Sequence, residues 1–395
     1  MHAARRASRP RRLVDLTSWA PGSSREFPYN QNCMNFIARQ AKLASVLRKA
    51  GFDALLITHL PNIRYLCGFT GTAGALLLQT GSRSHKATFY TDGRYTQQAH
   101  EEVNSARVVI GKRAAFAEAC AGAQKGKIGV LGFEADHLAF SAYRHLAEAV
   151  RGKSRLKPAI GLVEELRVIK DGEEISQIRA SVLLAASLFQ TALSVIKPGV
   201  AETQIAGELE LQARRAGAEG MSFDTIVAAG PRSALPHGRA SSQTVPGEGF
   251  IILDYGVILA GYCSDMTRTV HVGPVSRTHR RMYEAVREAQ LASIKAVQPG
   301  AEGGQVDRAG REVLKKAGYE AYFTHSTGHG VGIEVHEPPR VAKDQTQKLE
   351  PGMVVTIEPG IYIPEEGGVR IEDMVLVTET GHEVLTPTTK DLITL

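Results

Sequence analysis

The feature that most constrains the fold is an internal repeat in the second half of the chain. The segment IKPGVAETQIAGELELQARRAG, residues 196–217, aligns with VQPGAEGGQVDRAGREVLKKAG, residues 297–318, at a constant offset of 101. Each copy follows a long amphipathic stretch, turns at Pro-Gly and ends a second helical stretch at Ala-Gly, as helices often do. The repeat predicts two related halves, each made of two helices followed by strands, with a cleft between them.

The first half of the chain predicts a separate α/β unit. A helical pattern over 35–51 leads into an apolar run over 53–58 that is typical of a buried strand. The pattern changes near 160–172, where a long helix is expected to begin. We therefore predict an N-terminal domain over 34–166 and a catalytic domain over 167–395. Further strand-like segments support the first of these, at 74–80, 86–92, 106–111 and 127–133.

Residues 1–33 differ from the rest of the chain in charge. They carry six arginines against two acidic residues, which accounts for four of the six net positive charges. The remainder is close to neutral, so the charge pattern does not indicate a nucleic-acid or membrane surface. The segment lacks the apolar stretch that a secretory signal requires. We interpret it as a disordered leader or as an over-called start, with Met34 as the first residue.

Two features bear on location. The four cysteines are scattered without a paired spacing, which fits a reducing cytoplasm better than a disulfide framework. The most apolar run, SVLLAASLFQTALSVI at 181–196, is expected to be too short and too polar to span a bilayer. We interpret it as a core-facing helix and predict a cytoplasmic protein.

Three histidines fall within the segment THSTGHGVGIEVHEPP, residues 324–339, between closely spaced glycines. His325 and His329 stand four apart, which would place them on one face of a zinc-protease helix. Each interior glycine, however, destabilises a helix by about 0.8 to 1 kcal/mol relative to alanine. We therefore expect a tightly bent loop or strand entry, in which glycine permits a close backbone approach. Taken alone, the segment is equally compatible with a turn that carries surface histidines.

Four acidic residues interrupt otherwise apolar, strand-like segments. Asp254 follows three aliphatic residues, and Asp265 lies eleven residues further on, where a hairpin would bring the two together. Glu358 ends MVVTIE, and Glu372 is embedded in GGVRIEDMVLVT. Singly, each is more often a solvated or salt-bridged carboxylate, because an unpaired charge in an apolar strand is costly. Four that cluster beside a histidine would repel one another, and two divalent cations are the natural compensation.

These residues resemble the metal site of a known family. In order and local context, Asp254, Asp265, His329, Glu358 and Glu372 are similar to the five ligands of the creatinase/prolidase/aminopeptidase P family. The segments NIRYLCGFTGT and YTDGRYTQQA resemble its N-terminal domain, and LRVIKDGEEISQIR resembles its interdomain segment. The resemblance implies an α/β creatinase-like N-terminal domain followed by an α+β pita-bread catalytic domain with an internal pseudo-twofold repeat.

The resemblance also implies how the ligands are shared between two ions. Asp265 and Glu372 would bridge both metals, His329 and Glu358 would complete one site, and Asp254 would complete the other. An oxygen-rich set with one imidazole suits Mn²⁺ or Co²⁺, with Zn²⁺ as the alternative. Bound ions of this kind activate a water and polarise the scissile carbonyl.

Further roles follow from the same resemblance. Glu358 would act as the general base, and Arg370 would orient Asp254. The other implied residues face the substrate: His336, which supports the developing oxyanion; His237, which contacts the substrate carbonyl; His325; and, as a weaker candidate, Tyr362.

The leading functional prediction is an Xaa-Pro aminopeptidase, which hydrolyses the bond between an N-terminal residue and proline. The alternative within the family is an Xaa-Pro dipeptidase, which acts only on dipeptides. A creatinase-type hydrolase or an inactive peptide-binding relative is less favoured, because such relatives lose metal ligands and all five are present here. The predicted partners are a peptide with proline at position 2 and, by the resemblance, a second copy of the chain in a homodimer.

Overall fold

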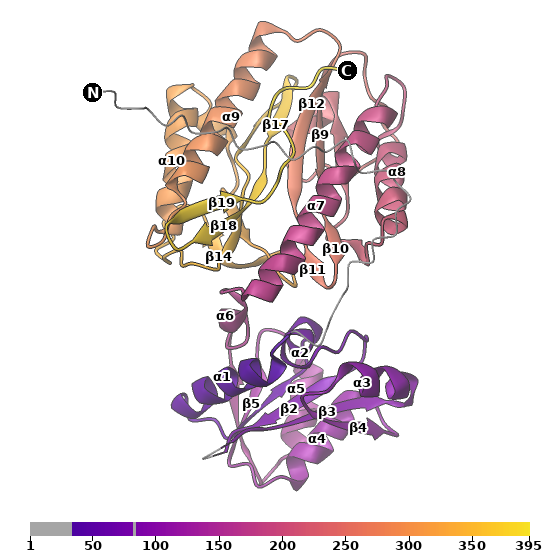
Figure 1. Ribbon diagram of the computed structural model, residues 1–395, viewed down its shortest axis with the longest axis vertical. Helices are drawn as coiled ribbons and strands as arrows, with labels where there is room; N and C mark the ends of the chain where they lie inside the picture. Colours follow the sequence, from indigo (N-terminus) through magenta and orange to yellow (C-terminus); the bar gives the residue numbers. More distant parts are fainter. Residues whose placement is uncertain (1–33, 82–83) are drawn as a thin grey trace, which may run out of the picture. The chain divides into compact units, whose positions relative to one another are not determined.

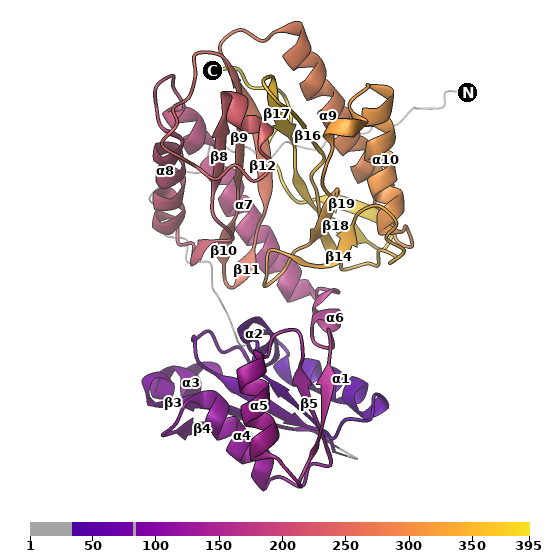
Figure 2. The same cartoon turned by 180° about the vertical axis from the view of Figure 1, so that it is seen from behind.

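The computed structural model describes residues 34–81 and 84–395 (Figure 1). The predicted leader, residues 1–33, lies outside the described residues. The described chain forms first an N-terminal part with one six-stranded sheet and then a catalytic part with several smaller sheets (Figures 1 and 2). Cys67, Cys120 and Cys263 are buried free thiols, which agrees with the scattered cysteine spacing.

The N-terminal part is built on a mixed sheet in the order β4-β3-β2-β1-β5-β6. Strand β2 runs antiparallel to β1 and β3, and the remaining neighbours are parallel. Both faces of β1 are buried: Leu55 and Ile57 pack with α1, whereas Ala54 and Leu56 pack with α4. This two-sided burial explains the continuous apolar run, and it confirms the α/β prediction. The elements are α1 (Phe36–Lys49), β1 (Ala54–Ile57), α2 (Leu60–Cys67), β2 (Ala75–Gln79), β3 (Lys86–Asp92), η3 (Gly93–Tyr95), α3 (Thr96–Glu102), β4 (Arg107–Gly111), α4 (Ala115–Lys125), β5 (Val130–Glu134), α5 (Phe140–Ala149), β6 (Arg155–Ala159) and α6 (Glu164–Arg167).

The two repeated segments adopt matching local structure. Each leads from a long helix through a Pro-Gly turn into a shorter helix. Gly199 and Gly300, 101 residues apart, both have positive φ, +87° and +82°. Gln204 and Gln305, at the same offset, cap the shorter helices by accepting from the backbone three residues earlier. A twofold relation between the whole halves stays a prediction. The helices are α7 (Gly172–Val195), α8 (Glu202–Arg215), α9 (Arg277–Ala296) and α10 (Gly303–Lys316).

Helix α7 contains the apolar run over 181–196 but extends well beyond it. It spans 24 residues, and by length and composition alone it could cross a membrane. The expectation that this run is too short and too polar is therefore corrected. One face of α7 packs inside the protein, with Leu184, Leu188 and Phe189 in a core shared with the strands of the first half. The prediction of a core-facing helix is confirmed.

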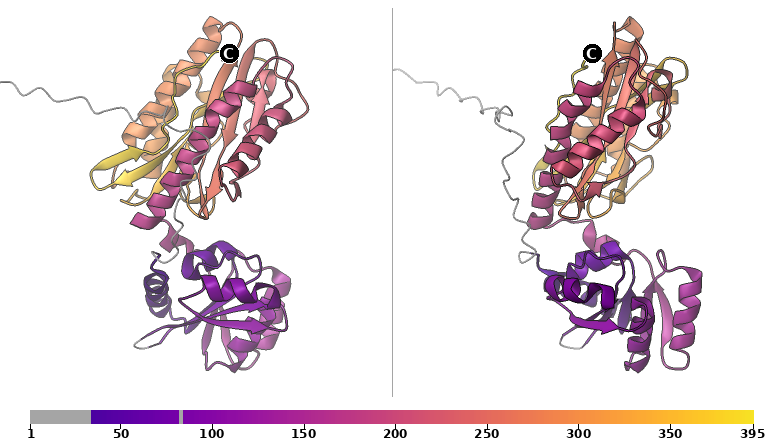
Figure 3. Two further views of the ribbon diagram at one scale, coloured as in Figure 1. Left: turned by 45° about the vertical axis from the view of Figure 1, so that its right-hand side comes forward. Right: turned by 90° about the vertical axis from the view of Figure 1, so that its right-hand side faces the viewer.

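The strands of the catalytic part form short antiparallel sheets (Figures 2 and 3). The first half contributes the sheets β12-β9-β8 and β11-β10-β7, and the second half contributes β14-β13-β15-β18-β19 and the pair β16-β17. All residues of β9 and β12 are buried, so polar side chains on these strands face protein rather than water. The elements are β7 (Gly220–Met221), β8 (Ile226–Ala229), η4 (Gly230–Ala234), β9 (Gly249–Tyr255), β10 (Val257–Leu259), β11 (Tyr262–Cys263), β12 (Met266–Val272), η5 (Glu320–Tyr322), β13 (Gly328–Gly330), β14 (Glu337–Val341), β15 (Val354–Ile357), β16 (Gly360–Ile363), β17 (Gly367–Arg370), β18 (Asp373–Thr378) and β19 (Gly381–Val384).

Candidate metal centre

Two of the predicted acidic residues lie on one hairpin. Strands β9 and β12 pair antiparallel, with Asp254 directly opposite Thr267. Asp265 immediately precedes β12. Both aspartates are buried, with exposed fractions of 8% and 5%. The hairpin expected from the sequence therefore brings the two carboxylates to the same end of the strand pair.

The other two acidic residues come from the second half. Glu358 follows β15, and Glu372 lies between β17 and β18. Thr267 links Glu372 to the hairpin: its hydroxyl donates to Glu372 Oε2 at 2.6 Å, and its carbonyl accepts from the Glu372 amide at 3.1 Å. The two halves thus meet at one group of side chains. We call it the carboxylate cluster: Asp254, Asp265, Glu358 and Glu372.

The carboxylate cluster holds more negative charge than the surrounding protein compensates. Within the described part of the chain, one buried oxygen of each of Asp254, Asp265 and Glu372 has no hydrogen-bond partner. Burial, and then the charge of Glu372, raises the pKa of Asp265 and of Glu358 well above the usual range. Burial, and then the charge of Asp254, raises the pKa of Glu372 to about 8. Such a site favours cations, so these residues fit a divalent metal centre.

His329 lies on β13 in the glycine-rich segment, in a strand rather than a helix. A Cβ atom at Gly328 would overlap the carbonyl of Thr356, and one at Gly330 would overlap the carbonyl of Pro338. Glycine at these positions therefore lets neighbouring backbone approach on both sides of His329. The zinc-protease helix is excluded, and the expected close backbone approach is confirmed.

The ring of His329 presents a lone pair to the carboxylate cluster. Its Nδ1 lies 3.0 Å from the carbonyl of Gly330, which can only accept, so Nδ1 carries the proton. Burial lowers the pKa of His329 to about 4, which leaves Nε2 unprotonated at neutral pH. This Nε2 lies 3.7 Å from Asp265 Oδ2 and 3.5 Å from Glu358 Oε1. Ligand atoms of Asp265, His329 and Glu372 all lie within 4.8 Å of one another, a spacing that can hold a metal ion.

A chain of hydrogen bonds runs from Asp254 to His325. Arg370 donates to Asp254 Oδ2 at 2.6 Å and to the hydroxyl of Tyr362 at 2.7 Å. The Tyr362 hydroxyl lies 2.8 Å from Nε2 of His325, whose Nδ1 lies 2.8 Å from the carbonyl of Ser326. Both ring nitrogens of His325 are therefore engaged within the protein. Any contact between His325 and a ligand would use the edge or face of the ring.

The remaining predicted histidines border the same site. The ring of His336 lies 4.5 Å from that of His329, centroid to centroid, in an edge-to-face arrangement. Partial desolvation lowers the pKa of His336, while the charge of Asp254 raises it and that of His237 lowers it. His237 is exposed, on the loop after η4, and its neighbour Pro236 accepts from Arg370 at 3.1 Å. All ten residues predicted from the sequence therefore lie in or around one site.

Two threonines of the site were not predicted. Thr267 accepts from Nε of Arg370 at 3.2 Å, in addition to its bond to Glu372. Thr356 accepts from the amide of His329 at 3.1 Å and lies 3.5 Å from Glu358 Oε1. Both are wholly buried. Each stands two residues from a predicted ligand in a strand-like segment, and this spacing, which puts side chains on one face, could have identified them.

Helix α10 holds the loop that leads into β13. Asp307 accepts from the hydroxyl of Thr327 at 2.8 Å and pairs with Arg311 at 2.7 Å. Arg311 in turn donates to the carbonyls of Phe323 and His325, at 3.1 and 2.6 Å. In the sequence, Asp307 and Arg311 look like any charged pair one helical turn apart.

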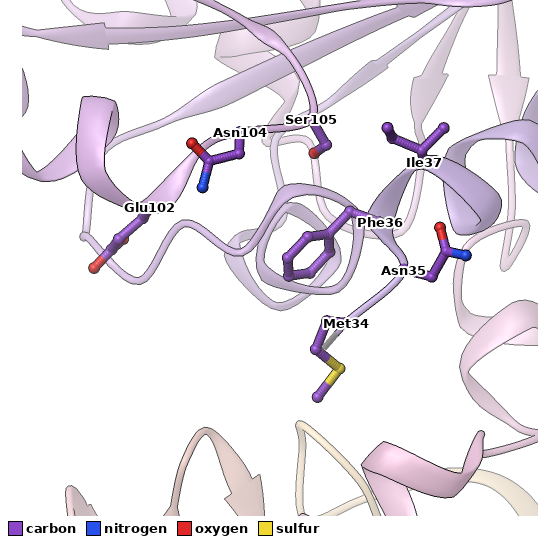
Figure 4. Close-up of a pocket in the computed structure, with 7 residues that line it drawn as sticks. All are labelled: Met34, Asn35, Phe36, Ile37, Glu102, Asn104 and Ser105. Atoms are coloured by element: carbon purple, nitrogen blue, oxygen red, sulfur yellow. The ribbon is translucent and has the colours of Figure 1, made fainter. Parts of the chain in front are cut away.

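A small pocket of about 170 Å³ lies at the start of α1 (Figure 4). It contains none of the predicted site residues. Figure 4 shows the seven residues that line it, which lie around the start of α1 and the end of α3. The lining residues are Met34, Asn35, Phe36, Ile37, Glu102, Asn104 and Ser105.

The geometry describes a two-part protein with a buried cation site of acidic residues and histidine, the arrangement of a metal-dependent hydrolase. Two family models match the chain: Creatinase/Prolidase N-terminal domain over residues 39–169, and Metallopeptidase family M24 over residues 176–379. The chain belongs to metallopeptidase family M24. The predicted creatinase-like domain, the pita-bread catalytic domain and the metal-dependent peptidase class are confirmed.

Individual relatives match over nearly their whole length. The chain is 37% identical to the Xaa-Pro dipeptidase of Pyrococcus horikoshii, over 89% of this chain and 97% of the relative. The solved Xaa-Pro dipeptidase from Bacillus anthracis superposes with a TM-score of 0.87 at 42% identity, over 91% of this chain and all of that one. The X-Pro aminopeptidase from Thermotoga maritima superposes with a TM-score of 0.81 at 34% identity, over 88% and 99%.

Proposed function

We propose that this protein is an Xaa-Pro dipeptidase, which hydrolyses the bond between an N-terminal residue and a C-terminal proline. The observation that carries the proposal is the carboxylate cluster with His329, whose unpartnered oxygens and ring Nε2 lie close together. Relatives named as dipeptidases, matched over nearly their whole length, support the choice of substrate.

The sequence favoured the aminopeptidase, and the comparisons favour the dipeptidase instead. The motifs of the metal site are common to both activities, so they cannot distinguish the length of the substrate. Xaa-Pro aminopeptidase is the second candidate, because a solved enzyme of that name matches nearly the whole chain at 34% identity.

The metal ligands we propose are Asp254, Asp265, His329, Glu358 and Glu372. Bound divalent ions would supply an activated water and polarise the scissile carbonyl. We propose two ions per chain, Mn²⁺ or Co²⁺, since oxygen donors predominate. Arg370 holds Asp254 in place, and Thr267 holds Glu372, so the protein fixes the orientation of carboxylates on both halves.

Three residues would transfer a proton or stabilise the charge that develops during the reaction. Glu358, whose pKa burial and Glu372 raise, would accept the proton of the attacking water. His336, whose pKa is lowered by partial desolvation, is neutral at pH 7, and it would donate an N–H to the oxyanion that forms at the scissile carbonyl. His237 would contact the same carbonyl from the opposite loop. A cytoplasmic location and a homodimer stay predictions.

The test is hydrolysis of four peptides by protein supplied with Mn²⁺ or Co²⁺. We expect cleavage of Ala-Pro and little cleavage of Ala-Pro-Gly, Ala-Ala or N-acetyl-Ala-Pro. Equal cleavage of Ala-Pro-Gly would favour the aminopeptidase, and equal cleavage of Ala-Ala would overturn the proline preference. A dialysed protein that retains no metal and cleaves none of the four would overturn the peptidase proposal.

A further inference from the structure

Four charged side chains lie directly behind the turn that carries His336. Arg167 ends α6, Lys170 follows it, and Glu334 and Glu337 flank His336. We call these four residues the anchor cluster. The side chains of Arg167, Lys170 and Glu337 are only 2%, 1% and 3% exposed. No predicted role in the reaction uses them.

The side chains of the anchor cluster form hydrogen bonds that hold the turn of His336 together. Arg167 donates to Glu334 Oε2 at 2.8 Å and also to Glu337 Oε1. Lys170 donates to Glu337 Oε2 at 3.1 Å. The amide of Glu334 donates to Glu337 Oε1 at 3.0 Å, so the Glu337 carboxylate bridges both ends of the turn. A Cβ atom at Gly332 would meet this carboxylate, which explains the third glycine of the segment.

The opposite side of the same turn faces the metal centre. Glu337 begins β14 and pairs with Gly330, the residue after His329. The rings of His336 and His329 are in edge-to-face contact. His336 itself is exposed, so its position depends on the backbone on either side of it. A shift of Glu337 would therefore move His336 relative to His329.

We propose that Arg167 and Lys170 are positioning residues, which set the place of His336 by holding Glu337. The proposal rests on the proposed function for the reaction that His336 serves. The N-terminal part also supports this turn. Asn62 accepts from Arg167 at 2.7 Å, and His59 lies 3.0 Å from Glu334 Oε1. Loss of Arg167 would leave Glu337 buried with one cation instead of two.

The chain offers a matched control in Arg39. This arginine is also buried, at 7% exposure, and it also joins α1 to two carboxylates of the catalytic part, Asp171 at 2.7 Å and Glu174 at 3.2 Å. It makes no contact with the turn of His336 in the described structure. Arg167→Met and Arg39→Met therefore remove equivalent buried cations, one behind His336 and one away from it.

The experiment compares both variants by hydrolysis of Ala-Pro, by bound metal and by hydrogen–deuterium exchange of the peptide over 331–341. For Arg167→Met we expect kcat to fall about tenfold to a hundredfold with KM within about threefold, as for a misplaced catalytic group. Exchange over 331–341 should accelerate, while bound metal stays unchanged. Arg39→Met should lose thermal stability with kcat within about twofold and unchanged exchange over 331–341.

Two outcomes would overturn the proposal: accelerated exchange in Arg167→Met with a wild-type kcat, or an equal loss of kcat in Arg39→Met. If Arg167→Met does not fold, the charge-neutral pair Arg167→Met/Glu337→Gln takes its place with the same expectations. If the wild-type protein hydrolyses no peptide, the proposed function fails. The exchange measurement then still decides whether Arg167 holds the turn.

Discussion

The carboxylate cluster and the anchor cluster both hold buried acidic side chains near His336, and their electrostatics are opposite. In the carboxylate cluster, burial and mutual repulsion raise the pKa of Asp265, Glu358 and Glu372. In the anchor cluster burial also raises the pKa of Glu337, but Lys170 and Arg167 outweigh it and the net shift is downward. Equal burial thus gives opposite protonation behaviour.

This electrostatic difference indicates which of the two clusters binds a ligand. Protein cations already neutralise the anchor cluster, and every oxygen of Glu337 is used. The carboxylate cluster has Arg370, which is committed to Asp254 and Tyr362, and it keeps free buried oxygens. A buried charge without a partner is costly, so one cluster stabilises the fold as it stands and the other requires ions from solution.

The largest expected effect is the loss of a bridging ligand. We predict that Asp265→Ala or Glu372→Ala abolishes hydrolysis of Ala-Pro and lowers bound metal, because each would remove coordination from two ions at once. Metal analysis after dialysis and a peptide assay check this. If either variant keeps wild-type activity and unchanged bound metal, the carboxylate cluster does not bind metal through that residue, and the contrast with the anchor cluster fails.

The same isosteric change should have opposite effects on stability in the two clusters. In metal-free protein at pH 7, Glu337→Gln should lower the free energy of unfolding by about 3 kcal/mol, because it leaves buried cations without their partner. Glu372→Gln should raise it by about 1 to 3 kcal/mol, because glutamine is neutral without the proton that buried Glu372 must take up on folding at this pH. The folded-state pKa of Glu372 is raised from 4.5 to about 8, so its destabilising effect grows as pH rises through that interval.

Urea unfolding of both variants in the presence of a chelator measures this contrast. Addition of Mn²⁺ should reverse the order for Glu372→Gln, since the wild type then gains the binding energy of the metal. If both variants are destabilised in the chelator, the protein itself already compensates the negative charge of the carboxylate cluster.

His336 lies between the two clusters, and its own removal should affect the reaction alone. We predict that His336→Ala lowers kcat by about 10² to 10³, the effect of one oxyanion contact, with bound metal unchanged. Its side chain is exposed, so the free energy of unfolding should change by less than about 0.5 kcal/mol. Loss of metal in this variant would place His336 among the ligands instead.

The sequence predicted the carboxylate cluster far better than the anchor cluster. Asp254 and Glu372 are conspicuous because they interrupt apolar strands. Their order along the chain also resembles that of the metal ligands of a known family. Arg167 and Glu337 are 170 residues apart, each in a segment where a charged side chain is ordinary. Only the tertiary fold brings them together, so no local pattern reveals the pair.

Secondary structure shows the same division. The buried strand β1 and the turn glycines of the repeat depend on local side-chain pattern and backbone conformation, and both were predicted. The start of α7 near residue 172 was also predicted, and the structure shows that a capping box at Asp171 and a buried hydrogen bond from Tyr262 to Glu174 fix its first turns. The bond with Tyr262 joins residues 88 apart in the sequence, so no local pattern reveals it.

The smallest expected effect concerns Glu334, the member of the anchor cluster nearest to solvent. Burial raises its pKa, but the hydrogen bond with His59 and the charge of Arg167 outweigh this and lower the pKa from 4.5 to about 2. A depressed carboxylate pKa contributes stability above the unfolded value, and this contribution is lost as pH falls from 4.5 towards 2. Its side chain is 34% exposed, so solvent screening limits the contribution to about 1 kcal/mol. Glu334→Gln should therefore unfold at a slightly lower temperature than the wild type at pH 6 to 7, and the gap should narrow as pH falls below 4.5. A gap that stays constant down to pH 3 would mean that Glu334 acts through shape and not through charge, which would confine the electrostatic anchor to Glu337.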